Sequence, residues 1–139
     1  MLLTVGKHVL GNLEPRCARM ATGFAGGVGD SQQEMCDALS GGVLVIGGLL
    51  GRTSLDEDDQ PALALATRYR ARFLAELGAT QCARLWEMVY APGGPGSCAP
   101  LVEKAATICG SAWDPNRWWT TYGGIFSISW GKGSVGRFC

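Results

Sequence analysis

The sequence predicts an all-α fold: a compact bundle of about five helices around a glycine-rich, buried central helix, followed by an irregular tail. Apolar residues recur at helical spacing through most of the first 110 residues, and no segment there alternates with the period of two typical of a strand. A chain of 139 residues suits one ordinary core. We expect a helical cysteine-containing domain over residues 1–110. We expect the Trp- and Gly-rich residues 111–139 to form an irregular tail that packs on the bundle or on another subunit, or else an extension that is disordered or non-native.

Two short helices are expected before the central one. Leu2 to Leu10 has an amphipathic pattern that ends at Gly11, and Pro15 can open a second helix because proline is tolerated in a first turn. The loop GFAGGVG, residues 23–29, follows. Its glycines do not form a G-x-G-x-x-G pattern and no strand precedes them, so we do not expect a nucleotide site there.

The central helix is expected to run from Ser31 to Gly51. Ser31 and Glu34 have the spacing of a capping box, and glycine is a natural helix end. Each interior glycine costs about 1 kcal/mol relative to alanine, so close packing of neighbouring helices must compensate for four of them. The apolar run within this helix is about 14 residues, too short for the roughly 20 that span a bilayer. The four glycines are Gly41, Gly42, Gly47 and Gly48.

Three further helices follow, each bounded by residues that favour helix ends. Ala62 to Leu77 is rich in Ala, Leu and Arg and closes at the following glycine. The other two are expected over residues 81–90, capped by Thr80, and from a cap at Ser97 to about Cys109.

Net charge, the N-terminal sequence and the cysteine content indicate which partners, location and chemistry to expect. Twelve basic and twelve acidic residues leave no formal net charge, which gives no electrostatic argument for a nucleic-acid or anionic-membrane partner. The N-terminus has no charged region ahead of its apolar residues, unlike a signal peptide, so we expect a cytoplasmic protein that does not span a membrane. Six cysteines without a C-x-x-C pair favour redox or metal chemistry at a site assembled from distant helices.

Three cysteines are the candidate site residues: Cys36, Cys82 and Cys98. With Thr80 and Ser97 as caps, Cys82 and Cys98 lie in first helical turns, where free N–H groups and the helix dipole favour a thiolate. Two such thiols beside a buried third would suit thiol–disulfide exchange or the capture of a soft metal. The alternative is that Cys36 is a small core residue and that the other two positions are coincidental.

Several stretches of the sequence resemble one family. They are ATGFAGGVGDSQQEMCDALSGGVLVIGGLLG (residues 21–51), the acidic turn and Arg-rich helix that follow it, CARL (82–85), and C-A-P-L-V (98–102). Together they resemble the C_GCAxxG_C_C family of small bacterial and archaeal redox-active proteins, which have four characteristic cysteines and a C-G-A-x-x-G motif. The resemblance spans roughly residues 2–109.

By position in this resemblance, Cys36 opens the motif, and Cys82 and Cys98 match the third and fourth family cysteines. Asp37 stands where the motif has glycine, and the first family cysteine has no counterpart. The resemblance implies redox-active or cluster-binding cysteines without naming a substrate.

Three functions fit these observations, and whether the chain is an enzyme stays open among them. In a thiol-redox protein, Cys82 would be the nucleophile and Cys36 the resolving residue, acting on a partner protein or a small thiol or disulfide. Alternatively, the three candidate cysteines would bind an iron–sulfur cluster or a soft metal, with a fourth ligand from Cys17, His8 or the second subunit of a homodimer. The third function is a helical interaction module with inert cysteines.

Overall fold

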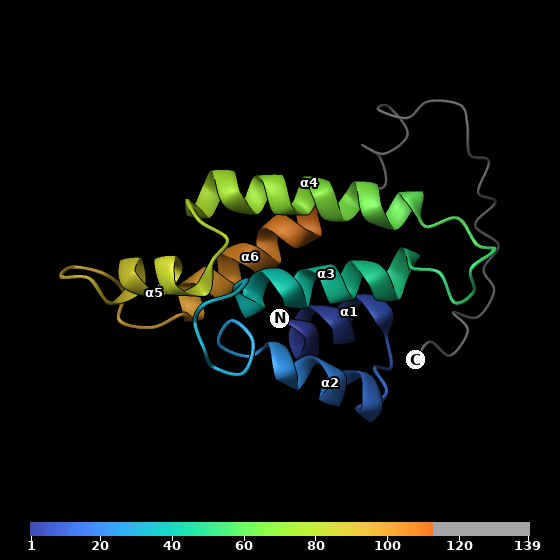
Figure 1. Ribbon diagram of the computed structural model, residues 1–139, viewed down its shortest axis with the longest axis horizontal. Helices are drawn as coiled ribbons and strands as arrows, with labels where there is room; N and C mark the ends of the chain where they lie inside the picture. The colour runs from blue at the N-terminus through green and yellow to red at the C-terminus, as the bar shows by residue number, and fades with distance from the viewer. Residues whose placement is uncertain (113–139) are drawn as a thin grey trace.

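The fold of residues 1–112, the part of the chain that the computed structural model describes, is all-α (Figure 1). The described residues contain no β-strand; a single antiparallel bridge joins Met35 to Gln81. The all-α prediction is therefore confirmed, with six α-helices in place of about five. The predicted tail beyond residue 112 lies outside the described residues.

The helical elements in chain order are η1 (a π-helical turn, Leu2–Gly6), α1 (Lys7–Leu10), α2 (Pro15–Ala21), η2 (a 3₁₀ turn, Thr22–Phe24), α3 (Asp37–Leu50), α4 (Gln60–Leu77), α5 (Cys82–Tyr90) and α6 (Ala99–Ala112).

Helix α3 is the centre of the bundle. It contacts α4, α6, α1 and the turn η1, and α4 also packs on α6. Figure 1 shows α4 running beside α3, with α5 at one end of the molecule next to the start of α6. Half of the 14 residues of α3 are buried, among them Leu39, Val45 and Ile46. The prediction of a buried central helix is confirmed.

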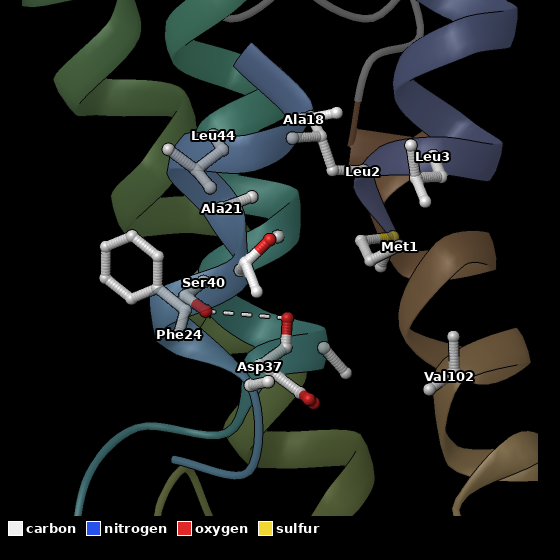
Figure 2. A pocket seen from close by; sticks show the side chains of 14 residues that line it. Met1, Leu2, Leu3, Ala18, Ala21, Phe24, Asp37, Ser40, Leu44 and Val102 are labelled. Atoms are coloured by element: carbon white, nitrogen blue, oxygen red, sulfur yellow. Dashed lines mark hydrogen bonds between the residues drawn. The ribbon is translucent and has the colours of Figure 1, made fainter. Parts of the chain in front are cut away.

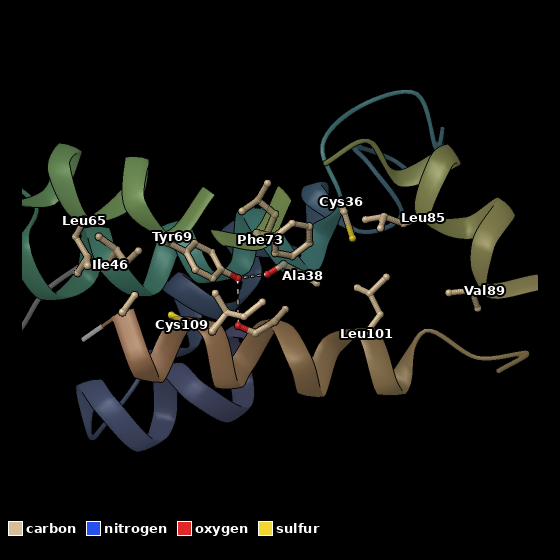
Figure 3. Packing of buried hydrophobic residues seen from close by; sticks show 14 residues of the cluster. Cys36, Ala38, Ile46, Leu65, Tyr69, Phe73, Leu85, Val89, Leu101 and Cys109 are labelled. Atoms are coloured by element: carbon tan, nitrogen blue, oxygen red, sulfur yellow. Dashed lines mark hydrogen bonds between the residues drawn. The ribbon is translucent and has the colours of Figure 1, made fainter. Parts of the chain in front are cut away.

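Tyr69 joins the three main helices at the centre of the core (Figure 3). Its side chain on α4 is fully buried, and its hydroxyl donates a hydrogen bond to the carbonyl oxygen of Ala38 on α3 at 3.1 Å. The same hydroxyl lies 3.5 Å from the carbonyl oxygen of Ala105 on α6. The ring meets Phe73 edge-on at a centroid distance of 6.1 Å, a favourable aromatic geometry. A buried tyrosine thus has both its apolar surface and its hydroxyl satisfied.

The interior glycines of α3 are sites of close approach. A Cβ atom on Gly42 would overlap the ring of Tyr69, one on Gly41 would lie 2.7 Å from Cβ of Met1, and one on Gly48 would lie 2.9 Å from Cδ1 of Leu10. For Gly47, an added Cβ atom would have no atom of another part of the described chain within 4 Å. The packing expected from the sequence is therefore present at three of the four glycines. No helix within residues 1–112 combines the length and the apolarity needed to cross a membrane.

The predicted start of the central helix at Ser31 is wrong, because α3 begins at Asp37. The hydroxyl of Ser31 donates to the carbonyl oxygen of Gly27 at 2.7 Å and accepts from the N–H of Gln33 at 3.3 Å. The serine therefore closes a turn in the preceding loop and does not cap a helix. The other boundaries differ less: α2 begins at Pro15 as expected, and α4 ends before a left-handed Gly78 with φ of 83°.

Candidate functional site

The structure brings Cys36, Cys82 and Cys98 to one pocket of about 290 Å³, named here the thiol pocket. Each cysteine stands at the start of a different helix. Cys36 immediately precedes α3, Cys82 is the first residue of α5, and Cys98 immediately precedes α6. The thiol pocket is thus formed where three helix N-termini meet. Its other lining residues include Asp30 and Asp37.

The predicted helix caps beside two of these cysteines are displaced by one residue. Gln81, not Thr80, precedes α5, so Cys82 takes the first helical position instead of the second. Helix α6 begins at Ala99, whose N–H donates to the hydroxyl of Ser97 at 3.2 Å. Ser97 therefore does stabilise this helix start, from one residue further out than expected.

A short backbone pairing brings two of the cysteines together. The loop segment 32–36 runs antiparallel to residues 80–83 around the bridge between Met35 and Gln81. Because Cys36 and Cys82 both belong to this pairing, their positions are fixed by main-chain hydrogen bonds and not by side-chain packing alone. The main-chain bonds run from Cys36 N–H to Thr80 O (2.9 Å), from Cys82 N–H to Glu34 O (2.9 Å) and from Ala83 N–H to Gln32 O (2.8 Å). The side-chain amide of Gln81 adds a fourth bond, which Nε2 donates to Gln33 O at 2.8 Å.

The glycine-rich loop forms one wall of the thiol pocket in an unusual backbone conformation. All five residues from Gly26 to Asp30 have positive φ, between 58° and 72°. Such a run is left-handed, which costs about 1–2 kcal/mol for each residue with a side chain, and a β-branched residue such as Val28 is a marked outlier. The glycines make the run possible, and Gly27 packs directly on the Cβ atom of Cys82.

The three cysteines of the thiol pocket differ in how much of their surface is exposed to solvent. Cys36 is buried, with 5% of its surface exposed, Cys82 is half-buried, and Cys98 is exposed. Figure 3 shows Cys36 at the α5 end of the core, pointing toward Leu85 and lying near Leu101. The thiol pocket therefore offers thiols at three depths, from solvent down to the core.

Burial and negative charge determine the ionisation of the two inner thiols. Burial raises the pKa of Cys36 from its usual 9.0 to about 11, with further increases from the charges of Asp37 and Cys82. Burial also raises the pKa of Cys82, followed by the charges of Asp37, Cys98 and Asp30. The expectation that the helix terminus keeps Cys82 as a thiolate is therefore wrong, since desolvation and two carboxylates oppose the dipole.

Asp37 connects the glycine loop to the first thiol. Its Oδ2 accepts a hydrogen bond from the N–H of Gly26 at 3.1 Å, and its Oδ1 accepts a weak one from the thiol of Cys36 at 3.8 Å. The carboxylate is exposed and not buried without a partner. It also borders a second pocket of about 260 Å³ between η1, α2 and α3, where Figure 2 shows it below Ser40. The position that departs from the family motif thus has a structural role at the site.

The described residues do not fit the iron–sulfur or soft-metal alternative. Within residues 1–112, no group of three or more His, Cys, Asp or Glu side chains is arranged to hold a metal ion. Of the three proposed sources of a fourth ligand, the two within this chain, Cys17 on α2 and the exposed His8 on α1, do not line the thiol pocket. We therefore derive no chemistry through a metal.

Reasoning from the sequence missed an aromatic pair at the thiol pocket. Trp86 and Tyr90 are four residues apart on α5, so they share one helix face, and their ring centroids lie 4.6 Å apart. Both line the pocket, and both stay largely exposed. Their i, i+4 spacing was the signal available in the sequence.

Comparison with known proteins gives one match. Residues 1–112 match the model of the family described as "Putative redox-active protein (C_GCAxxG_C_C)". Neither a curated protein nor a solved structure matches the chain. The matched residues are most of the chain and contain all three cysteines of the thiol pocket. The chain therefore belongs to the C_GCAxxG_C_C family.

Proposed function

We propose that this protein is a thiol-redox protein that exchanges disulfides at the thiol pocket, with Cys82 as the nucleophile and Cys36 as the resolving residue. One observation carries the proposal: three cysteines from distant parts of the chain line a single pocket. Cys82 is the thiol of intermediate depth, because it is half-buried whereas Cys36 is buried and Cys98 is exposed. Cys98, the exposed thiol, stands at the solvent end.

The proposed reaction transfers two electrons to a disulfide RS–SR of a partner protein or a small molecule. The thiolate of Cys82 attacks one sulfur, the S–S bond breaks, and RS⁻ leaves and takes up a proton. The thiolate of Cys36 then attacks the sulfur of Cys82 in the mixed disulfide and releases the second RS⁻. The products are a Cys36–Cys82 disulfide and two RSH molecules, so the partner is reduced and the protein is oxidised.

The raised pKa values suit a protein whose resting thiols are protonated. Attack requires loss of a proton from Cys82, and the rate should therefore rise with pH until the pKa of Cys82 is passed. Because Cys36 is buried, it is protected from outside reagents and becomes relevant once Cys82 carries a mixed disulfide. This division favours exchange in the stated order.

The test traps the mixed disulfide. After reaction with bis(2-hydroxyethyl) disulfide, the wild-type protein should contain a Cys36–Cys82 linkage, and Cys36→Ser should accumulate the adduct on Cys82, both read by peptide mass spectrometry. Cys109→Ser is the matched control, because Cys109 is equally buried but does not line the thiol pocket. A folded protein that forms neither species would overturn the proposal and leave an interaction module with inert cysteines.

A further inference from the structure

We infer that the thiol pocket selects small disulfides that carry positively charged amine groups and disfavours disulfides that carry carboxylates. This inference rests on the proposed function, because it names the substrate class of the same site. The inference rests on three features of the pocket: its unbalanced charge, the position of its carboxylates and the aromatic pair Trp86 and Tyr90 at its edge.

Within residues 1–112, the charged residues that line the thiol pocket are all acidic. They are Asp30 and Asp37, and no Lys, Arg or His of this part of the chain lines the pocket. The basic residue on the adjoining helix, Arg84, forms an ion pair with Glu87 at 3.2 Å and does not line the pocket. A cationic ligand therefore meets two carboxylates with no competing positive charge among the lining residues, and an anionic ligand is repelled.

The charges of the two carboxylates also bear on the ionisation of Cys82. Both charges contribute to the raised pKa of Cys82, after the larger effect of burial. The carboxylate of Asp37 is held in place by the N–H of Gly26, and the main chain of Asp30 is held by a hydrogen bond from its N–H to the carbonyl oxygen of Ala25 at 2.9 Å. A cationic substrate would offset both charges on arrival, which would favour the thiolate of Cys82 at the moment when the disulfide is present.

The aromatic side chains of Trp86 and Tyr90, which line the thiol pocket, supply a second attraction for a cation. The rings of Trp86 and Tyr90 lie 4.6 Å apart on one face of α5, with 43% and 47% of these residues exposed. An ammonium group over such a ring is attracted by the ring quadrupole. The pocket volume of about 290 Å³ lies at the low end for small-molecule sites, which suits a small disulfide.

The experiment compares three disulfides of similar size: cystamine (cationic), bis(2-hydroxyethyl) disulfide (neutral) and dithiodiglycolate (anionic). Rates of adduct formation on Cys82 are measured in the Cys36→Ser background by mass spectrometry. Each rate is divided by the rate for the same disulfide with unfolded protein, which removes differences in leaving-group reactivity. The folded protein should prefer the cation over the anion by at least about tenfold, and added salt should weaken this preference.

The variants locate the cause of the preference. Asp30→Asn with Asp37→Asn should reduce the cation-to-anion ratio toward one, and Trp86→Leu should reduce the cystamine rate alone. Asp56→Asn is the matched control, since Asp56 lies in the exposed turn after α3, far from the pocket. Should the double variant not fold, Asp30→Asn alone and the salt dependence of the wild type give the same readout.

The outcomes separate the two proposals. Equal corrected rates for all three disulfides, or a ratio unchanged in the double variant, would overturn the charge selectivity while leaving disulfide exchange intact. Failure of every disulfide to react with Cys82 in the folded protein would overturn the proposed function itself, and the substrate class with it.

Discussion

A Cβ atom on Gly27 would lie 2.6 Å from the Cβ atom of Cys82, so the glycine loop and the proposed nucleophile are in direct contact. Gly27 is buried and has φ of 72°, whereas most of the loop is exposed. The loop thus holds the start of α5 in place through a contact that only glycine permits. This relationship links the glycine-rich segment of the sequence to the chemistry of a cysteine more than fifty residues later.

Replacing Gly27 should therefore disturb both stability and reactivity. We expect Gly27→Ala to lower the free energy of unfolding, measured in urea, by about 1–3 kcal/mol more than Gly29→Ala does, because of overpacking against Cys82. Gly29 is the matched control: its φ of 62° imposes the same left-handed strain, but nothing lies within 4 Å of its added Cβ atom. The alkylation rate of Cys82 should change in Gly27→Ala alone. Equal losses of stability in the two variants would contradict a contact between loop and thiol.

Val28 offers a test of the left-handed run itself. A valine at φ of 66° is strained, and with 46% of its surface exposed it contributes little buried area. Asparagine tolerates this conformation better, so we expect Val28→Asn to raise the free energy of unfolding by about 1 kcal/mol. The control is Val102→Asn, at a half-buried helical position, which should destabilise. A loss of stability in Val28→Asn would argue against the left-handed conformation of this segment.

Asp37 should control the acidity of the pocket thiols. Asp37→Asn keeps an oxygen that can accept from Gly26 but removes the charge that raises the pKa of both Cys36 and Cys82. We therefore expect the pH profile for alkylation of Cys82 by an uncharged reagent to move to lower pH, with a several-fold faster rate at pH 8. Asp56→Asn should leave the profile unchanged. An unaltered profile in Asp37→Asn would show that the carboxylate does not act on the thiol.

Local signals in the sequence were sufficient to predict most of the helices, but they were insufficient to predict the geometry of the thiol pocket. Pro15 and Gly78 mark helix ends through their own backbone preferences, and the structure follows them. The start of α3 was misplaced because the hydroxyl of Ser31 serves a turn of the glycine loop, and because segment 32–36 pairs with residues 80–83. Pairing between such distant segments has no local signature, so the geometry around Cys36 required the folded structure.

The close crossing of α3 and α4 predicts how glycine substitutions in α3 affect the stability of the protein. A side chain at Gly42 would overlap Tyr69, whose hydroxyl is bonded to Ala38 and which therefore cannot easily move. We expect Gly42→Ala to lower the free energy of unfolding by about 1–3 kcal/mol. Gly47→Ala on the same helix meets nothing and should raise it by up to about 1 kcal/mol through helix propensity. Urea denaturation of both variants measures the difference, and effects of the same sign would contradict the observed crossing.

Alkaline pH should destabilise the protein through its buried thiols. Burial raises the pKa of Cys36 and of Cys109 from 9.0 to about 11, so the folded-state value lies above that of the unfolded chain. The contribution of each thiol is therefore fully present below pH 9 and is lost as the pH rises toward 11, since only the unfolded chain releases the proton in that window. Between pH 8 and pH 10 each thiol should account for a loss of about 1.3 kcal/mol.

The effect is isolated by comparing the wild type with the double variant Cys36→Ala with Cys109→Ala. The free energy of unfolding of both proteins is measured in urea, with a reductant present, at pH 8, 9 and 10. The double variant is less stable at pH 8 because it loses buried volume, but its stability should fall by about 2–3 kcal/mol less between pH 8 and pH 10. Burial raises the pKa of Tyr69 in both proteins, and only the smaller increases from the charges of Cys109 and Cys36 are lost in the double variant. Parallel losses in the two proteins would mean that both thiols ionise as easily in the folded state as in the unfolded chain. In that case the buried environment that keeps Cys36 protonated until Cys82 has reacted would be absent, and the proposed order of attack would lose its physical basis.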